Sequence, residues 1–212
     1  INSSLQRILI VEDNDDLRNY LVDMLKTSYN IQACPNGKDA LIIIREFNPD
    51  LVISDIMMPE MSGDELCSAI KGDLEMSHIP VVLLTAQGDE KNMLEGLEIG
   101  ADAYITKPFS VGILKATIKN LLANRALLRQ VYNSIEEEEH NFPVNCTNTL
   151  DWKFIASVKE CIEKNMGDPD FNVEMLSSRH HMSRTSFFNK LKVLTGYAPA
   201  DYIRLIRLQH AA

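Results

Sequence analysis

The chain has 212 residues, of which 45% are hydrophobic and 24% charged, with a formal net charge of −9 at pH 7. This length favours two domains with packed cores, and no apolar run approaches the roughly 18 consecutive residues of a membrane span, so we expect a soluble protein. The four cysteines are scattered without a Cys-x-x-Cys pair, which predicts reduced thiols in a cytoplasmic protein rather than a disulfide framework or a zinc site.

The first 125 residues alternate between short apolar runs and amphipathic segments. The expected strands lie near 7–11, 30–34, 51–54, 80–84 and 103–106. The apolar stripe of the first expected helix consists of Leu17, Tyr20, Leu21, Met24 and Leu25. Strands that are apolar throughout are typical of a parallel sheet with helices on both faces. Five such units predict an α/β fold, a doubly wound (βα)5 parallel sheet.

Polar side chains stand at the ends of four of these strands. Glu12 and Asp13 follow the first strand and Asp55 follows the third. Thr85 and Lys107 come after the apolar residues of the fourth and fifth strands. In an open parallel sheet the reactive groups gather outside the carboxyl ends of the strands, so we expect these side chains to form one pocket.

Phosphoryl transfer onto a carboxylate requires such a set of groups. An aspartate such as Asp55 can act as the nucleophile and form an aspartyl-phosphate. Mg²⁺ prefers oxygen ligands, so Asp13 and Asp55 suit as direct ligands, with Glu12 holding a metal-bound water. Lys107 would place a cation at one phosphoryl oxygen, and the Thr85 hydroxyl would donate to another.

Residues 7–125 resemble the receiver domain of two-component response regulators. The resemblance rests on four elements that occur in the family's order: Glu12-Asp13, the Asp-x-x-Met-Pro-x-Met-x-Gly run from Asp55 to Gly63, Thr85-Ala86, and Lys107-Pro108-Phe109. It implies a phosphoacceptor at Asp55, with Thr85 and Lys107 as its catalytic partners, and a cis peptide bond before Pro108.

The same resemblance implies a cofactor and a switch. Mg²⁺ would be bound by Glu12, Asp13, Asp55 and the backbone carbonyl of Met57. Glu12 stands where many members of the family have Asp, which keeps the charge but lengthens the side chain. Tyr104, three residues before Lys107, matches the family's switch aromatic.

Two alternatives compete for these residues. A strand-end aspartate is most often a turn or N-cap residue, and Asp15 and Asp16 suit an acidic helix start. A metal-dependent phosphatase also uses a strand-end aspartate, but commonly has a second acid two residues later. Met57 occupies that position here and cannot transfer a proton.

We place the receiver at residues 5–125, a linker at 126–150 and a second, all-helical domain at 151–212. The start of the linker, up to Tyr132, can extend the last helix of the receiver. The run Glu136–Glu139 carries like charges with few apolar anchors, so we expect a solvated tether.

The second domain has the pattern of a helix-turn-helix. Trp152, Ile155, Val158 and Ile162 mark the apolar face of its first helix. A short helix near 173–180 is followed by a helix for which Ser183 is a suitable N-cap and Gly196 a suitable C-cap. His180 and His181 would point about 100° apart on a helix, which suits solvent or a partner better than one metal ion.

The helix after Ser183 has two distinct sides. Its buried side would be formed by Phe187, Leu191 and Leu194, and its polar side by Arg184, Thr185, Phe188, Asn189 and Lys192. Residues 177–212 hold one acidic residue and six basic ones, which indicates an anionic partner. Such a polar side suits reading of the DNA major groove, although a helix with a few cations is more often just a solvated face.

A second resemblance favours DNA. The runs Met182–Phe187, Leu191–Gly196 and Pro199–Leu208 resemble the first half of an AraC-type DNA-binding domain, in which a long helix joins two helix-turn-helices. The chain stops at Ala212, inside that joining helix, so we expect weak DNA binding by this segment. His181 occupies a turn position where the family often has glycine.

A receiver followed by this domain resembles the C-terminal end of hybrid two-component regulators, whose sensor kinase lies upstream on the same polypeptide. The resemblance implies a phosphorylation-controlled transcription regulator. A phospho-histidine kinase domain is its partner, and phosphorylation favours a homodimer through the surface around helix 4, strand 5 and helix 5. Enzymatic activity of this segment would be limited to its own phosphorylation and dephosphorylation. The alternative is a receiver that signals through protein docking without direct DNA binding.

Overall fold

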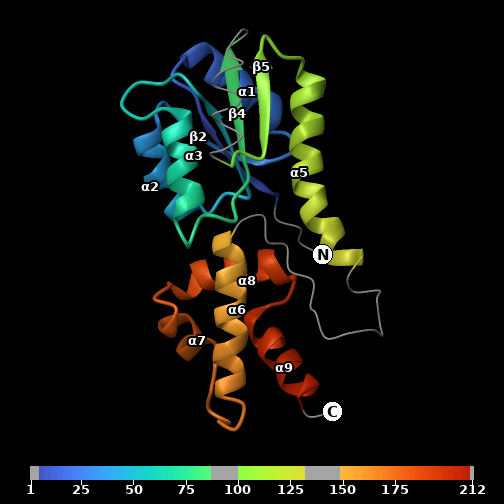
Figure 1. Ribbon diagram of the computed structural model, residues 1–212. Coiled ribbons are helices and arrows are strands. Elements are labelled where there is room, and N and C mark those ends of the chain that lie inside the picture. Colours follow the sequence, from blue (N-terminus) through green and yellow to red (C-terminus); the bar gives the residue numbers. More distant parts are fainter. Residues whose placement is uncertain (1–4, 87–99, 132–148, 211–212) are drawn as a thin grey trace. The chain divides into compact units, whose positions relative to one another are not determined.

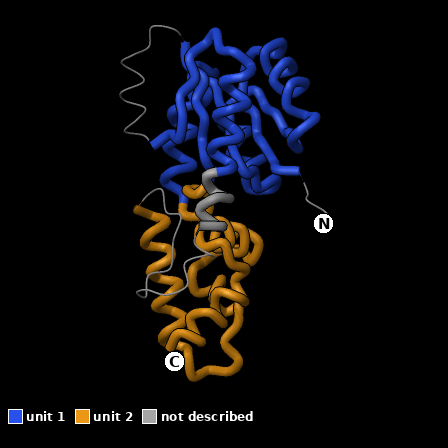
Figure 2. The backbone as a smooth tube through the Cα atoms, turned by 90° about the vertical axis from the view of Figure 1, so that its right-hand side faces the viewer, with its two compact units in different colours: residues 1–73, 79–123 blue, residues 74–78, 124–212 orange. Residues whose placement is uncertain are grey.

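The computed structural model describes residues 5–86, 100–131 and 149–210. The chain forms two compact units, the first comprising residues 1–73 and 79–123 and the second residues 74–78 and 124–212 (Figure 2). Within the described residues, no helix combines the length and the apolar character that crossing a bilayer requires.

The first unit is built on a five-stranded parallel sheet (Figure 1). Its strands are β1 (Arg7–Val11), β2 (Asn30–Cys34), β3 (Leu51–Asp55), β4 (Val81–Ala86) and β5 (Ala103–Lys107). They lie in the order β2-β1-β3-β4-β5, which places β1 and β3 between other strands and leaves β2 and β5 at the edges. The predicted strand positions and the doubly wound parallel sheet are therefore confirmed.

The described helices of this unit are α1 (Asp15–Leu25), α2 (Gly37–Phe47), α3 (Gly63–Gly72) and α5 (Val111–Val131). The first three begin at polar N-caps, because the side chains of Asn14, Asn36 and Ser62 each accept a hydrogen bond from a backbone N–H three residues later. The predicted extension of the last helix into the linker is confirmed as far as Val131. Residues 87–99, between β4 and β5, lie outside the described residues, and so does most of the predicted linker.

Helices cover both faces of the sheet, as the apolar strands predict (Figure 1). On one face, alternate strand residues such as Ile10 and Ile53 pack with Leu21 of α1 and Leu114 of α5. The strand residues between them are also buried, on the side where α2 contacts β1 and α3 contacts β4. The predicted stripe of α1 is wrong at Tyr20, which is 51% exposed.

The second unit is helical. It contains α6 (Thr149–Lys164), α7 (Val173–Arg179), α8 (Arg184–Thr195) and α9 (Pro199–Gln209). Their shared core includes Val158 of α6, Leu176 of α7, Leu191 of α8 and Ile206 of α9. The predicted caps of α8 are present. The Ser183 hydroxyl accepts from the Ser186 N–H at 3.0 Å, and Gly196 takes a φ of 78°.

Two predictions for this unit are wrong. Trp152 was expected on the apolar face of α6 but is 55% exposed, and Phe154 is buried in the core. His180 is half-buried rather than exposed to solvent. Its ring lies 5.7 Å from the rings of Phe154 and Phe187, and its Nδ1 is 2.8 Å from the carbonyl oxygen of Leu176. It therefore helps to join α6, α7 and α8 through packing.

The turn between α7 and α8 places a non-glycine residue in the left-handed region. His181 has a φ of 54° and is exposed, so its side chain contributes little packing to offset the strain. The substitution His181→Gly removes a left-handed penalty of about 1–2 kcal/mol, and the greater freedom of glycine in the unfolded chain offsets part of that gain. We expect a net stabilisation of the helical unit of about 0.5–1 kcal/mol, measured by urea unfolding followed by Trp152 fluorescence.

The neighbouring histidine is the matched control. His180→Ala removes a ring that packs against both Phe154 and Phe187, so it should destabilise the same unit. A destabilised His181→Gly variant would show that the His181 side chain contributes more than its backbone strain costs.

Candidate functional site

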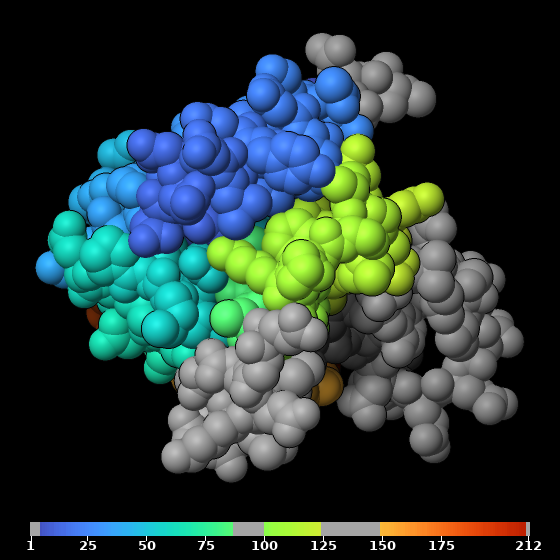
Figure 3. All heavy atoms as spheres, turned by 90° about the horizontal axis from the view of Figure 1, so that it is seen from above, coloured from blue at the N-terminus to red at the C-terminus, as the bar shows by residue number. Residues whose placement is uncertain are grey.

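The parallel register brings the ends of the central strands to one edge of the sheet. Val11 pairs with Ser54, Asp55 with Leu84, and Thr85 with Thr106. The residues that follow each strand therefore leave the sheet at the same edge. In Figure 3, which looks down on that edge, the blue β1–α1 region and the yellow-green β5–α5 region meet.

Three carboxylates converge there, as predicted. One oxygen from each of Glu12, Asp13 and Asp55 lies within 4.8 Å of the others. Glu12 is only 1% exposed and Asp55 8%, whereas Asp13 is exposed. Lys107 completes the cluster, because its Nζ lies 2.9 Å from Glu12 Oε2 and 3.0 Å from Asp55 Oδ1.

The two oxygens of Asp55 differ in their contacts. Oδ1 accepts a hydrogen bond from the Ile56 N–H at 2.9 Å and also faces Lys107. The hydrogen bond and the ion pair that the described residues make to this carboxylate both involve Oδ1, and neither involves Oδ2. Among the described residues, the carboxylate is thus held through Oδ1.

The electrostatics of the cluster favour a cation. Burial raises the pKa of the Glu12 carboxyl above its ordinary value, and the neighbouring Asp55 carboxylate adds to the increase. The hydrogen bond from Lys107 lowers the pKa of Glu12, as does the one from the Asn14 N–H. Lys107 therefore offsets part of the cost of holding two buried carboxylates together, and a divalent cation would offset more of it.

The donor set fits Mg²⁺. Mg²⁺ takes oxygen ligands and is usually held by one or two carboxylates plus water and phosphate. Glu12, Asp13 and Asp55 offer only oxygen, at mutual distances that one ion can span. Among the described residues, no other group of three or more Asp, Glu, His or Cys side chains lies close enough together to share a metal ion.

Thr85 and Tyr104 lie on the neighbouring strands β4 and β5. Among the described residues, neither side chain forms a hydrogen bond with Asp55. Thr85 is 3% exposed, and its hydroxyl donates to the Ala86 carbonyl at 3.4 Å. The Tyr104 hydroxyl is buried and finds no hydrogen-bond partner among the described residues. Burial, with smaller contributions from Cys67 and Asp64, raises the pKa of Tyr104 to about 12. The phenol is therefore neutral near pH 7.

The loop after Asp55 depends on a close backbone approach at Gly63. The Gly63 N–H donates to the Ile56 carbonyl at 2.9 Å, and a Cβ on Gly63 would lie 2.1 Å from the Asp55 carbonyl oxygen. Ser62 and Glu65 form a capping box at the start of α3. The Met57 side chain is 68% exposed, and the role of its carbonyl stays a prediction. The peptide bond between Lys107 and Pro108 is cis, as the resemblance implied.

One residue of this region was missed in the sequence. Arg18 of α1 donates from Nη1 to the Glu12 carbonyl at 2.7 Å and reaches the Asp13 carbonyl at 3.4 Å. The available signal was a single arginine in the first turn of an otherwise acidic helix start, next to Asp15 and Asp16. That pattern does not reveal whether the side chain faces solvent or turns back to the strand end.

The predicted two sides of α8 are confirmed in their burial. Phe187, Leu191 and Leu194 are buried, whereas Arg184, Thr185, Phe188 and Lys192 are exposed and Asn189 is half-buried. Lys190 belongs to neither set. Its side chain is fully buried, with Nζ 2.7 Å from Asp151 Oδ1 and 5.0 Å from the centre of the Phe154 ring. Of the two lysines on α8, Lys192 is thus the one that remains available to a partner.

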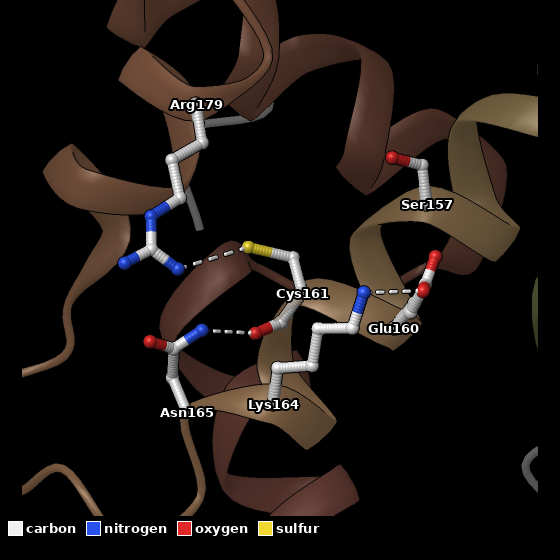
Figure 4. Close-up of a pocket in the computed structure, with 6 residues that line it drawn as sticks. All are labelled: Ser157, Glu160, Cys161, Lys164, Asn165 and Arg179. Atoms are coloured by element: carbon white, nitrogen blue, oxygen red, sulfur yellow. Dashed lines mark hydrogen bonds and ion pairs between the residues drawn. The ribbon is translucent and has the colours of Figure 1, made fainter.

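The helical unit also contains a polar pocket of about 350 Å³ between α6 and α7 (Figure 4). Arg179 points across it and donates to the Cys161 thiol at 3.6 Å, while Asn165 donates to the Cys161 carbonyl at 2.6 Å. Lys164 pairs with Glu160 at 2.6 Å. These groups satisfy one another, so the pocket has no convergent reactive set comparable to the one at the sheet edge.

Comparisons with known proteins agree with the geometry of the first unit. Residues 8–119 match the family model of the response regulator receiver domain. The chain is 43% identical over 206 residues to Histidine kinase P4 of Formosa agariphila. The matched region covers 97% of this chain but only 15% of that protein. It is 41% identical over 121 residues to the sensor histidine kinase TmoS of Ectopseudomonas mendocina, covering 57% of this chain and 12% of that protein. The chain thus spans a small part of the length of these relatives.

Solved structures show the same fold. The receiver domain of a signal transduction histidine kinase from Syntrophus aciditrophicus is 36% identical, with a TM-score of 0.54, and covers 65% of this chain and 99% of that one. A response regulator from Chloroflexus aurantiacus is 33% identical, with a TM-score of 0.55, and covers 57% and 99%. Since the family model spans more than half of the chain and the first unit has the predicted doubly wound parallel sheet, this chain belongs to the response regulator receiver family of two-component systems.

Proposed function

We propose that residues 5–125 form a receiver that accepts a phosphoryl group on Asp55 from a phospho-histidine. The observation that carries this proposal is the convergence of Asp55 with two further carboxylates and Lys107 at one sheet edge. Asp55 Oδ2 would attack phosphorus, so that an O–P bond forms while the P–N bond to the histidine breaks. The histidine leaves with the electron pair of that bond and takes up a proton.

The chain's own residues divide the remaining work. Lys107 Nζ already contacts Asp55 Oδ1, so a modest movement would place its charge at a transferred phosphoryl oxygen. The Thr85 hydroxyl, one residue before the end of β4, would donate to another phosphoryl oxygen. Glu12, Asp13, Asp55 and the Met57 carbonyl would hold Mg²⁺, which when bound neutralises charge on the transferring group.

The transfer is tested with the purified chain and a small-molecule phosphodonor such as acetyl phosphate. We expect at most one phosphoryl group per chain, with peptide mapping that assigns it to Asp55. Labelling should require Mg²⁺, so a chelator added before the phosphodonor should prevent it. Labelling that does not require a divalent cation would contradict the proposed site.

We further propose that phosphorylation controls the helical region, with residues 126–150 as linker and 151–212 as a partial AraC-type DNA-binding domain. Support comes from the exposed polar side of α8 and from the basic excess of residues 177–212. The 43% identity over 97% of this chain to a protein named as a histidine kinase supports a parent that combines kinase and receiver. We propose that this segment of the parent lies in the cytoplasm. The switch would favour a homodimer through Tyr104 and the surface around the expected helix 4, β5 and α5. The expected helix 4, between β4 and β5, lies outside the described residues.

DNA binding is tested with a longer chain that continues past Ala212. With about four phosphate contacts, the logarithm of the binding constant should fall with the logarithm of salt concentration at a slope of about −3.6. Lys192→Ala should reduce that slope by about one, while Lys153→Ala, an exposed lysine on α6, should leave it unchanged. Binding with no salt dependence would favour the alternative, a receiver that signals through protein docking.

A further inference from the structure

We propose that Arg18 is a positioning residue that holds the β1–α1 loop so that Glu12 and Asp13 present their carboxylates to a divalent cation. This inference rests on the proposed function of the same site. The Arg18 side chain is 19% exposed although it carries a full charge, and it turns back from α1 to the end of β1. Its guanidinium, not a neighbouring backbone amide, contacts the carbonyls of the acidic pair.

The contacts of Arg18 are specific to the fork of a guanidinium. Nη1 donates to the Glu12 carbonyl at 2.7 Å and lies 3.4 Å from the Asp13 carbonyl, while Nη2 pairs with the Asp15 carboxylate. Arginine has five N–H donors in a fixed plane, so one side chain can serve several acceptors at once. A lysine at this position would offer a single point charge instead.

The loop is held from the opposite side as well. The Glu12 N–H donates to the Cys34 carbonyl at 3.1 Å, so both backbone polar groups of Glu12 have partners. Asn14 donates its N–H to Glu12 Oε1 at 3.4 Å and caps α1 by accepting from the Leu17 N–H at 2.9 Å. Arg18 therefore joins α1 to the backbone carbonyls of Glu12 and Asp13.

Positioning and simple electrostatics predict opposite results. Removing a positive charge beside three carboxylates would, by charge alone, strengthen binding of a cation. If Arg18 instead orients the loop, its loss weakens binding despite the favourable change in charge. Outer-shell partners of metal ligands commonly contribute about 10–100-fold in metal affinity.

The test is Mg²⁺ titration of the full chain by calorimetry, with Mn²⁺ and its electron paramagnetic resonance signal as an independent readout. We expect Arg18→Met to weaken binding by about tenfold or more, and Arg18→Lys to recover only part of that loss. Arg45→Met is the control, since Arg45 lies on the exposed side of α2, where it pairs with Asp73 at 3.0 Å. It should bind Mg²⁺ like the wild type.

The outcomes separate the two proposals. A wild-type chain that binds no divalent cation contradicts the proposed function and this inference together. A wild-type chain that binds Mg²⁺, with Arg18→Met binding as tightly or more tightly, overturns only the role of Arg18. Thermal unfolding without metal shows whether Arg18→Met folds. If it does not fold, Arg18→Lys decides. Full wild-type affinity in that variant would show that the guanidinium fork is not needed, and this would overturn the proposed role of Arg18.

Discussion

Asp55→Asn is expected to reduce phosphoryl incorporation to background while the receiver remains folded. The amide keeps the size of the side chain and an oxygen that can accept from the Ile56 N–H. It lacks the negative charge that makes the carboxylate a nucleophile and a partner for Lys107. We expect complete loss of the phosphorylated species on a phosphate-affinity gel, with an unchanged circular dichroism spectrum.

The matched control for this loss is Asp16→Asn. Asp16 is an exposed aspartate at the start of α1, only three residues after Asp13, and it does not belong to the carboxylate cluster. That variant should be labelled at the wild-type rate. Phosphoryl uptake that persists in Asp55→Asn would identify another acceptor and refute the assignment of Asp55.

Gly63→Ala is expected to destabilise the receiver strongly. A Cβ at residue 63 would lie 2.1 Å from the Asp55 carbonyl oxygen and 3.0 Å from the Ile56 Cα. These are backbone atoms of Asp55 and Ile56 at the end of β3, so no flexible side chain can move aside. Overpacking in a tight site costs about 1–3 kcal/mol, and we place this variant at the upper end of that range. The corresponding fall in the melting temperature of the receiver is roughly 10 °C.

The other end of the same helix offers the control. Gly72 is the last residue of α3, is exposed, and has open space around the position of a Cβ. Gly72→Ala should leave stability unchanged or raise it by up to about 0.5–1 kcal/mol, because alanine loses less conformational freedom on folding. Calorimetry of both variants compares them directly. Equal melting temperatures would mean that the loop after Asp55 can shift without cost, and phosphoryl uptake by Gly63→Ala should then be normal.

The periodic part of the sequence predicted most of the receiver correctly. Apolar runs located all five strands, and polar residues at the strand ends identified the carboxylate cluster with Lys107. Such patterns succeed because a strand that is buried on both faces must be apolar at nearly every position. In addition, parallel strands place their carboxyl ends at one edge of the sheet. The caps Ser183 and Gly196 were predictable for a similar local reason.

Side chains that the helical periodicity allows to face either the core or the solvent were predicted less well. Tyr20 and Trp152 fit an apolar stripe but are mostly exposed, because each lies at the border of its stripe, where other side chains already fill the core. His180 was expected to face solvent or a partner, and it is instead half-buried against the rings of Phe154 and Phe187. Long and amphipathic side chains can bury or expose their polar ends, so neighbours far away in the sequence determine the outcome.

By itself, then, the sequence determined the order of the strands and helices along the chain, the residues at the sheet edge and the chemistry that those residues suit. Only the tertiary structure decided that Lys107 bridges Glu12 and Asp55, that Arg18 turns back onto the β1–α1 loop, and that Lys190 is buried against Asp151. The physical reason is the range of the interactions. Strand and helix patterns repeat every two to four residues, whereas each of these contacts depends on where a flexible charged side chain meets a partner from another segment.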